Sequence, residues 1–374
     1  HDRPRDAPRA HGARPPVTTP LGAHLRQMIA INGPITVARF MAEALGNPDH
    51  GYYMTRDPFG ATGDFITAPE VSQMFGELVG AWCADIWRQM GMPSPVALIE
   101  VGPGRGTFMS DALRATRQIH GFHAALHIHL VETSPLLRAR QASALAAYDV
   151  RWHDAVDDVP TGPTIVVANE LFDALPIHQF QFADGQWHER LIDVAENGAF
   201  RFVLDPTGAR FPGLNRFADP PPNAIAEICP SGAALALQLA GRLAEHPGAA
   251  LIVDYGQVQP GFGDTIQGVR AHRAQDIFDA PGTVDLCAHV DFAALRDAAH
   301  DGGARVWGPV PQGAFLTQLG IETRAAALTA ASPTDSGSIA ADMHRLTGPD
   351  EMGRLFKVLA LTSAGLEPAG FDDT

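Results

Sequence analysis

The sequence predicts an α/β fold with a mostly parallel, Rossmann-like sheet that carries helices on both faces. Apolar runs bounded by turn residues have the length of buried strands, and they lie at 96–101, 127–132, 165–170 and 251–256. Helical stretches separate these runs, and strands that alternate with helices are typical of parallel sheets. A glycine-rich turn, EVGPGRGT at 100–107, follows the first run and precedes a predicted helix. Such turns approach ligands in Rossmann-like folds.

The chain divides into an N-terminal part and a larger α/β part. Residues 1–20 are rich in proline and arginine, and we expect a disordered arm or sequence added for expression. Residues 21–92 are predicted to form helices and a loop, ending in a helix whose apolar residues recur from Val71 to Ile86. Residues 93–374 contain the predicted strands, so we assign the α/β domain to this range.

An insertion interrupts the α/β pattern at about 178–230. The segment 178–194 predicts a hairpin that turns at Asp184–Gly185, and the stretch 212–222 is a proline-rich loop. The region is long enough to reach over a ligand. We therefore expect it to cover the substrate.

Composition excludes several functional classes. The net charge of −15 disfavours binding to nucleic acid or anionic membranes, and no run of about 18 apolar residues predicts membrane insertion. The cysteines, Cys83, Cys229 and Cys287, lie far apart, without disulfide or metal-ligand spacing. We expect a reducing compartment, no metal, and a small-molecule or protein partner. Nothing in the sequence indicates an oligomeric state.

The glycine-rich turn predicts a cofactor site. Glycine tolerates backbone conformations that other residues avoid and allows close approach of a ligand, and the turn contains Glu100, Gly102, Pro103, Gly104 and Gly106. The start of the following helix offers free N–H groups to a carboxylate. The spacing G-P-G-R-G places the third glycine one residue earlier than the G-x-G-x-x-G pattern of dinucleotide sites. An ordinary tight turn is the alternative.

Acids at two further strand ends are candidates for cofactor contacts. Glu132 closes the second apolar run, where a carboxylate can bind ribose hydroxyls. Asp154 follows a probable third strand and is a candidate for contact with the adenine amino group. Both acids also fit solvated strand ends.

The segment ANELFDALP, 168–176, lies at another strand end, where open α/β sheets place their ligands. It supplies Asn169 as a cofactor-binding candidate and Glu170 and Asp173 as catalytic candidates. The glycine- and aromatic-rich loop 50–70 supplies candidates for a substrate channel, namely Tyr53, Asp64, Phe65 and Glu70. Solvated acids and core aromatic residues are the alternative interpretation.

Taken in order, these segments resemble the MidA family of S-adenosylmethionine-dependent methyltransferases. The matching segments include HGYYMTRDPFGATGDFITAPEVSQMFGELVG, EVGPGRGT, HLVE, ANELFDALPIHQF, LIVDYG, PGTVDLCAHVDF, GPVPQGAFLTQLGI and MGRLFKVLAL, and the match runs from about Leu21 to Leu361. The resemblance implies a class I methyltransferase fold with family-specific insertions, and S-adenosyl-L-methionine as cofactor. The family's mitochondrial member is an arginine methyltransferase that assists assembly of respiratory complex I.

The resemblance also implies a substrate and a location. It implies symmetric dimethylation of an arginine in a complex I subunit or its bacterial equivalent. The arginine-rich, lysine-poor composition is typical of a GC-rich bacterial genome, so we expect a bacterial cytoplasmic protein, with the mitochondrial matrix as the alternative. Two other functions stay open: a non-catalytic cofactor-binding assembly factor, and a nucleotide-dependent oxidoreductase.

Overall fold

The predicted parallel sheet is the centre of the structure. The computed structural model describes residues 18–57, 64 and 66–371. The strands of the large sheet are, in spatial order, β15 (Arg305–Pro311), β16 (Phe356–Thr362), β10 (Gly248–Gln257), β5 (Thr164–Asn169), β2 (Val96–Val101), β3 (Leu126–Val131) and β4 (Val150–His153), while β14 (Val290–Asp291) pairs with β10. The α/β fold class is confirmed. Three of the four predicted strands lie within one residue of their expected positions, and the fourth, β10, contains the predicted range 251–256 and begins three residues earlier.

Only β16 interrupts the parallel order among the long strands. It runs antiparallel both to β10 and to β15. The strands from β10 to β4 pair in parallel, with Glu100 opposite Val167 and Val101 opposite Ala168. Because parallel strands end at one edge, the segments that follow β2, β3 and β5 lie together.

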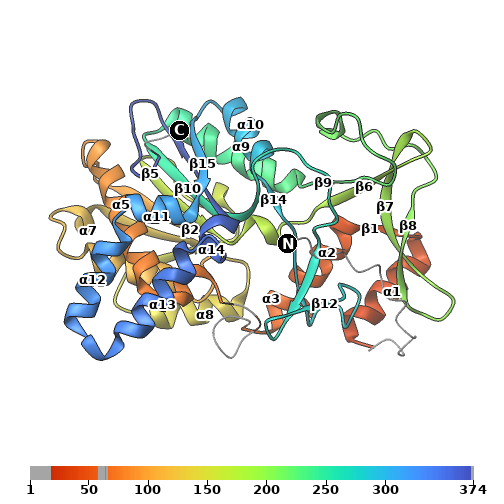
Figure 1. Ribbon diagram of the computed structural model, residues 1–374, viewed down its shortest axis with the longest axis horizontal. Helices are drawn as coiled ribbons and strands as arrows, with labels where there is room; N and C mark the ends of the chain where they lie inside the picture. The colour runs from red at the N-terminus through yellow and green to blue at the C-terminus, as the bar shows by residue number, and fades with distance from the viewer. Residues whose placement is uncertain (1–17, 58–63, 65, 372–374) are drawn as a thin grey trace.

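Helices cover both faces of this sheet (Figure 1). On one face, α5 (Gln73–Gln89) and α6 (Thr107–Thr116) pack in the larger core, and Phe75, Trp82 and Ile86 of α5 are buried as their helical spacing predicts. On the other face lie α9 (Pro230–Glu245) and α10 (Phe292–Asp301). Shorter helices, α7 (Phe122–Ala125) and α8 (Pro135–Ala144), adjoin β3.

A second sheet forms the other end of the molecule, on the right in Figure 1. It contains β1 (Ile35–Thr36), β7 (Gln186–Val194), β6 (His178–Ala183), β9 (Ile225–Ile228) and β8 (Phe200–Leu204). The hairpin of β6 and β7 turns at Asp184–Gly185, as predicted, where both residues have positive φ. A small third sheet contains β11 (Gln267–Arg270), β12 (Arg273–Gln275) and β13 (Asp285–Cys287).

The N-terminal helices belong to two different cores. Helices α1 (Pro20–Asn32) and α2 (Val37–Gly46) pack with the second sheet and with the segment that contains β13, whereas α5 belongs to the core of the large sheet. Between them lie α3 (Tyr52–Thr55) and α4 (Ala68–Val71). Most of the expected N-terminal arm, 1–17, lies outside the described residues. Thr19 caps α1 and donates a hydrogen bond to Pro281 O.

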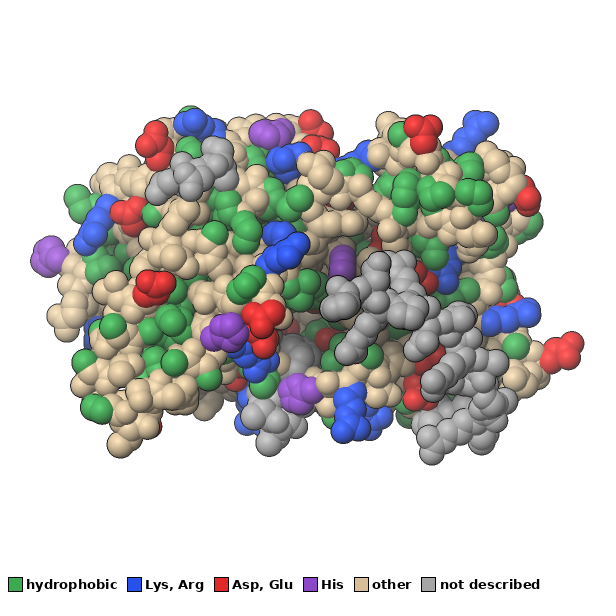
Figure 2. Space-filling model, in the orientation of Figure 1, with side chains coloured by type: hydrophobic (Ala, Val, Ile, Leu, Met, Phe, Trp, Pro, Cys, Tyr) green, Lys and Arg blue, Asp and Glu red, His purple; other side chains and the backbone are tan. Residues whose placement is uncertain are grey.

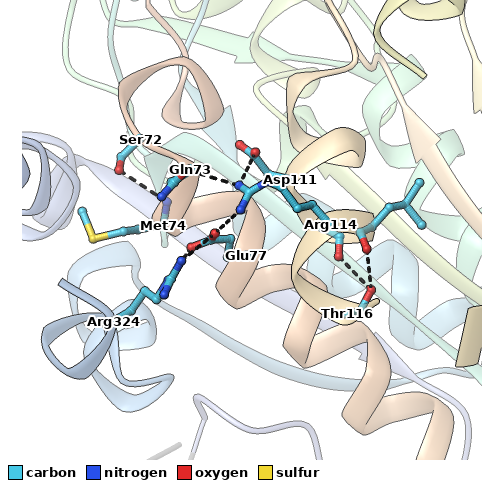
Figure 3. A network of polar contacts seen from close by, with 10 residues as sticks. Ser72, Gln73, Met74, Glu77, Asp111, Arg114, Thr116 and Arg324 are labelled. Atoms are coloured by element: carbon cyan, nitrogen blue, oxygen red, sulfur yellow. Dashed lines mark hydrogen bonds and ion pairs between the residues drawn. The ribbon is translucent and has the colours of Figure 1, made fainter. Parts of the chain in front are cut away.

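A second insertion, which is helical, separates β15 from β16. It comprises α11 (Gln312–Gln318), α12 (Ile321–Ala331), α13 (Ser336–Thr347) and α14 (Met352–Leu355). Arg324 of α12 joins Glu77 of α5 at 2.6 Å, and Arg114 of α6 joins the same carboxylate at 2.7 Å (Figure 3). This buried contact fastens the insertion to the helices beside the glycine-rich turn.

Among the described residues, no helix is both long and apolar enough to cross a membrane. On the face seen in Figure 2, acidic and basic side chains of the described residues are interspersed.

Candidate active site

The glycine-rich turn connects β2 to α6 through backbone that requires glycine. Gly102, Gly104 and Gly106 have φ values of +70°, +51° and +82°, all in the left-handed region. A Cβ on Gly102 would also lie 2.8 Å from Leu171 Cδ1. Gly106 caps α6 without a side-chain hydrogen bond, so the first N–H groups of this helix stay available to an anion.

This turn borders a cavity of about 330 Å³, hereafter the central cavity. Residues of four regions line it: the turn itself, the end of β3, the end of β5, and the N-terminal elements α2 to α4. They are Met41, Ala42, Leu45, Gly46, Tyr53, Met54, Thr67, Pro69, Glu70, Glu100, Gly102, Pro103, Gly104, Arg105, Thr107, Phe108, Glu132, Thr133, Leu137, Asn169, Glu170, Leu171, Ala174, Leu175 and Pro176. Candidates from distant parts of the sequence thus share one cavity.

Glu132 is held in place at the cavity wall. Its carboxylate accepts hydrogen bonds from Ser134 N at 2.7 Å and from Gln141 Nε2 at 3.2 Å. The same Gln141 nitrogen donates to Gly104 O at 2.8 Å, and Trp152 Nε1 donates to Gln141 Oε1 at 2.9 Å. Glu132 and the glycine turn are therefore fixed relative to each other, which suits a ligand that contacts both.

Two buried acceptors in the cavity wall have no hydrogen-bond partner among the described residues: Glu100 Oε2 and Asn169 Oδ1. Glu100 is 4 % exposed, and burial together with the nearby Glu132 raises the pKa of its carboxyl well above the usual range. A buried acceptor without a donor is costly, so a ligand that brings donors fits here. S-adenosylmethionine is such a ligand: Glu100 would hold its ammonium, the start of α6 its carboxylate, and Glu132 its ribose.

Glu170 also lines the cavity, directly after β5. Its Oε1 accepts hydrogen bonds from Ala68 N at 2.7 Å and from Asn169 Nδ2 at 3.3 Å, and its φ is +50°. Burial raises the pKa of this carboxyl to about 8, and the nearby Asp173 contributes in the same direction. Glu170 is therefore a carboxyl able to exchange a proton near neutral pH.

Asp173 does not line the central cavity. It lies near Tyr53, Tyr255, Asp254 and Asp285, and burial raises its pKa to about 6. Tyr53 does line the cavity, and its hydroxyl donates to Asp285 Oδ1 at 2.9 Å. Asp173 was predicted to contact the substrate directly. Its position outside the lining of the central cavity, next to acids and tyrosines, does not support that prediction.

The other candidates occupy different surroundings. Glu70 lines the cavity, hydrogen-bonds Thr107 and lies 3.7 Å from Arg105. Asp64 lies away from the lining, where it accepts hydrogen bonds from Tyr52 Oη at 2.7 Å and Ala271 N at 2.9 Å. Phe65 lies outside the described residues.

Asp154 also lies away from the cavity lining. Its side chain is 79 % exposed and pairs with Arg138 at 2.7 Å. This placement does not support the predicted contact with adenine, because the carboxylate is turned toward solvent and a surface arginine.

Sequence analysis missed several residues that build the site. Arg105, the arginine of the glycine turn, forms an ion pair with Asp57 at 2.9 Å. Gln141 and Asp285 were also not predicted, because Gln141 contacts Gly104 and Asp285 contacts Tyr53, which lie in other parts of the sequence. The segment PGTVDLC, which contains Asp285, had been noted only for its family resemblance.

Comparison with known proteins identifies the family. A family model described as "Putative S-adenosyl-L-methionine-dependent methyltransferase" matches residues 78–310. The chain belongs to this family. The MidA resemblance, the class of enzyme and the cofactor are thereby confirmed, and the oxidoreductase alternative gains no support.

Similar proteins cover nearly the whole chain. "Protein arginine methyltransferase NDUFAF7, mitochondrial" of Danio rerio is 39% identical over 366 residues, which span 90% of this chain and 86% of that protein. The protein of the same name in Homo sapiens is 36% identical over 371 residues, spanning 92% and 83%. A crystal structure from Burkholderia thailandensis, described as a likely methyl transferase bound to S-adenosyl-homocysteine, has a TM-score of 0.83 and 31% identity, covering 96% of this chain and 98% of that one.

Proposed function

We propose that this methyltransferase transfers a methyl group to an arginine side chain of a protein substrate. Relatives that share more than a third of its residues over most of their length are named protein arginine methyltransferases. The observation that carries the proposal is Glu170, a buried carboxyl in the wall of the same cavity as the glycine turn.

Arginine is a difficult nucleophile, and the residues of this cavity suit its requirements. A guanidinium has only donors and keeps its proton up to a pKa above about 12, so it must be oriented and must lose a proton during transfer. When bound, S-adenosylmethionine supplies a methyl group on a sulfonium, whose carbon–sulfur bond breaks as the new nitrogen–carbon bond forms. Glu170 orients the attacking nitrogen and takes its proton.

The finer proposal is symmetric dimethylation of an arginine in a respiratory complex I subunit, or in its bacterial equivalent, in support of assembly. The family resemblance supports this substrate. The relatives above are named mitochondrial, which supports the mitochondrial alternative for this chain and gives the expected bacterial cytoplasmic location no support. The protein substrate is the partner we propose, without a role for nucleic acid.

Methyl transfer from labelled S-adenosylmethionine tests the function. The chain would be incubated with candidate complex I subunits, and mass spectrometry would locate and count the methyl groups. Label on an arginine of the substrate supports the proposal. Tight cofactor binding without transfer to any candidate would favour the alternative of a non-catalytic assembly factor, and label on another residue type would contradict arginine as the acceptor.

A further inference from the structure

Asn169 offers the central cavity a fixed, unused hydrogen-bond acceptor. The residue is 8 % exposed and lines the cavity, and its Oδ1 has no partner among the described residues. Its Nδ2 donates to Glu170 Oε1 at 3.3 Å. That contact fixes which end of the amide faces Glu170, so the oxygen is left for a ligand.

The carboxylate of Glu170 offers a second acceptor beside Asn169. Two protein donors, Ala68 N and Asn169 Nδ2, both use Oε1. In the described part of the chain, no hydrogen bond or ion pair reaches Glu170 Oε2. Asn169 and Glu170 thus present two acceptors, Asn169 Oδ1 and Glu170 Oε2. The hydrogen bond from Asn169 Nδ2 to Glu170 Oε1 holds the two side chains together.

The charge of the cavity wall matches a ligand that carries only donors. Among the described lining residues, Arg105 is the sole basic side chain, and it is paired with Asp57. Acceptors therefore outnumber cationic donors around Asn169 and Glu170. A guanidinium has five N–H donors and no acceptor, and it forms paired hydrogen bonds with neighbouring oxygens.

Glu100 provides the other unpartnered acceptor on the same face of the sheet. It pairs in register with Val167, two residues before Asn169, and alternate residues of a strand share a face. In the same register Asn169 follows Ala168, the partner of Val101, so both acceptors lie near the glycine turn. The hydrogen bond to Glu170, which Asn169 makes and Glu100 lacks, distinguishes them.

We propose that Asn169 binds the substrate rather than the cofactor: its Oδ1 accepts a hydrogen bond from the guanidinium while its Nδ2 holds Glu170 in position. This inference rests on the proposed function and revises the prediction that Asn169 is a cofactor ligand. Asn169 and Glu170 then act as one unit on the attacking nitrogen, and Glu100 serves the cofactor.

Binding experiments on paired variants separate the two roles. The probe is Nα-acetyl-L-arginine methylamide, titrated by calorimetry or NMR into the chain saturated with S-adenosylhomocysteine. Asn169→Ala should weaken probe binding about tenfold and change the affinity for S-adenosylhomocysteine less than about threefold. Glu100→Gln should show the reverse pattern. Weaker cofactor binding with unchanged probe binding in Asn169→Ala would overturn the inference, as would a wild-type chain that binds no acceptor probe at about 10 mM.

A second variant keeps the test valid if Asn169→Ala does not fold. Asn169→Asp preserves shape but removes the donor to Glu170 and adds a negative charge beside it. The pH at half-maximal methyl transfer should rise by about one unit, because a negative charge beside Glu170 raises the pKa of its carboxyl. An unchanged pH profile in a folded variant contradicts the inference.

Matched probes distinguish this inference from the proposed function. Lysine and citrulline derivatives of the same design would be titrated alongside the arginine probe. Preference for another probe, still weakened by Asn169→Ala, contradicts arginine as the acceptor but supports Asn169 as the acceptor-binding residue. Preference for arginine without dependence on Asn169 supports the function and overturns the inference.

Discussion

At Glu170, backbone conformation, burial and hydrogen bonding act on a single carboxyl. A φ of +50° costs about 1–3 kcal/mol in a residue with a Cβ, and such strain persists only where neighbouring contacts enforce it. The hydrogen bond from Ala68 N and the ladder bond from Glu170 N to Val253 O, at 2.9 Å, are such contacts. The side chain is consequently presented to the cavity in one orientation, which reduces the reorganisation needed when a substrate binds.

Glu170→Gln should reduce turnover by about 100- to 10,000-fold while cofactor affinity changes little, because glutamine keeps the size of the side chain but cannot accept the proton.

The wild-type rate should rise with pH to a plateau above about pH 8, because burial raises the pKa of Glu170 to about 8 and only the ionised carboxylate accepts a proton. Single-turnover rates across pH measure both effects. A stable variant with the wild-type rate would remove Glu170 from the chemistry.

Glu132→Ala should weaken binding of S-adenosylhomocysteine by about 1.5–3 kcal/mol, the cost of a lost hydrogen bond to a charged group. Calorimetry measures the effect. Asp154→Ala is the matched control, because its carboxylate is exposed and pairs with Arg138. Equal losses in the two variants, or none in Glu132→Ala, would contradict the assignment of Glu132 to the ribose.

Among the elements, the connection from β2 to α6 and the packing of α6 determine where the cofactor end of the cavity lies. Three left-handed glycines allow the chain to turn within a few residues, and α6 starts without a side-chain cap. Glu77 of α5 then fixes α6 through Arg114 and α12 through Arg324 (Figure 3). Burial alone would raise the pKa of Glu77, but its ion pairs with Arg324 and Arg114 outweigh burial and lower it.

Gly104→Val should abolish cofactor binding and leave the fold largely intact. Valine at a φ of +51° strains the turn by about 1–3 kcal/mol and fills space next to the ligand. Circular dichroism checks the fold, and calorimetry checks binding. Gly241→Ala in α9, where a Cβ meets no atom within 4 Å, is the control. Normal binding by a folded Gly104→Val variant would place the cofactor elsewhere.

Glu77→Gln should lower the free energy of unfolding by about 1.5–3 kcal/mol near neutral pH. The loss stays below that of a fully buried ion pair, because Arg114 and Arg324 are 48% and 35% exposed. Since the pKa of Glu77 is lowered in the folded protein, its contribution is present above the usual glutamate pKa and lost as the pH falls below it. Urea denaturation at pH 7 and pH 4 measures the difference, with exposed Glu322→Gln as control. A pH-independent difference would contradict the ion-pair explanation.

On the scale of the whole molecule, the central cavity lies where two cores meet. Met41 and Leu45 of α2 belong to the core of the second sheet, whereas Phe108 and the glycine turn belong to the large sheet. A ligand in the cavity therefore contacts residues of both cores.

S-adenosylhomocysteine should bind with micromolar affinity, about −8 kcal/mol, and stabilise the folded chain by about 2.7 kcal/mol at one hundred times its dissociation constant. Thermal unfolding with increasing ligand measures this. Nicotinamide dinucleotides, tested at the same concentrations, should have no effect. No stabilisation by S-adenosylhomocysteine up to millimolar concentration would contradict the position of the cofactor site.

The sequence predicted the parallel strands of the large sheet, the glycine turn and the acids at the strand ends, because local periodicity and backbone requirements specify them. It did not predict β15 and the antiparallel β16. The strand at 96–101 and the hairpin at Asp184–Gly185 are found where their patterns placed them. Which acids face the cavity depends on long-range packing. Asp154 and Glu132 both follow strand ends, yet Asp154 is exposed and Glu132 is half-buried in the cavity wall, because packing against α8 and the glycine turn has no local signature. The division of the N-terminal helices between two cores, and the contact of Ala68 with Glu170, likewise arise from residues brought together only by folding.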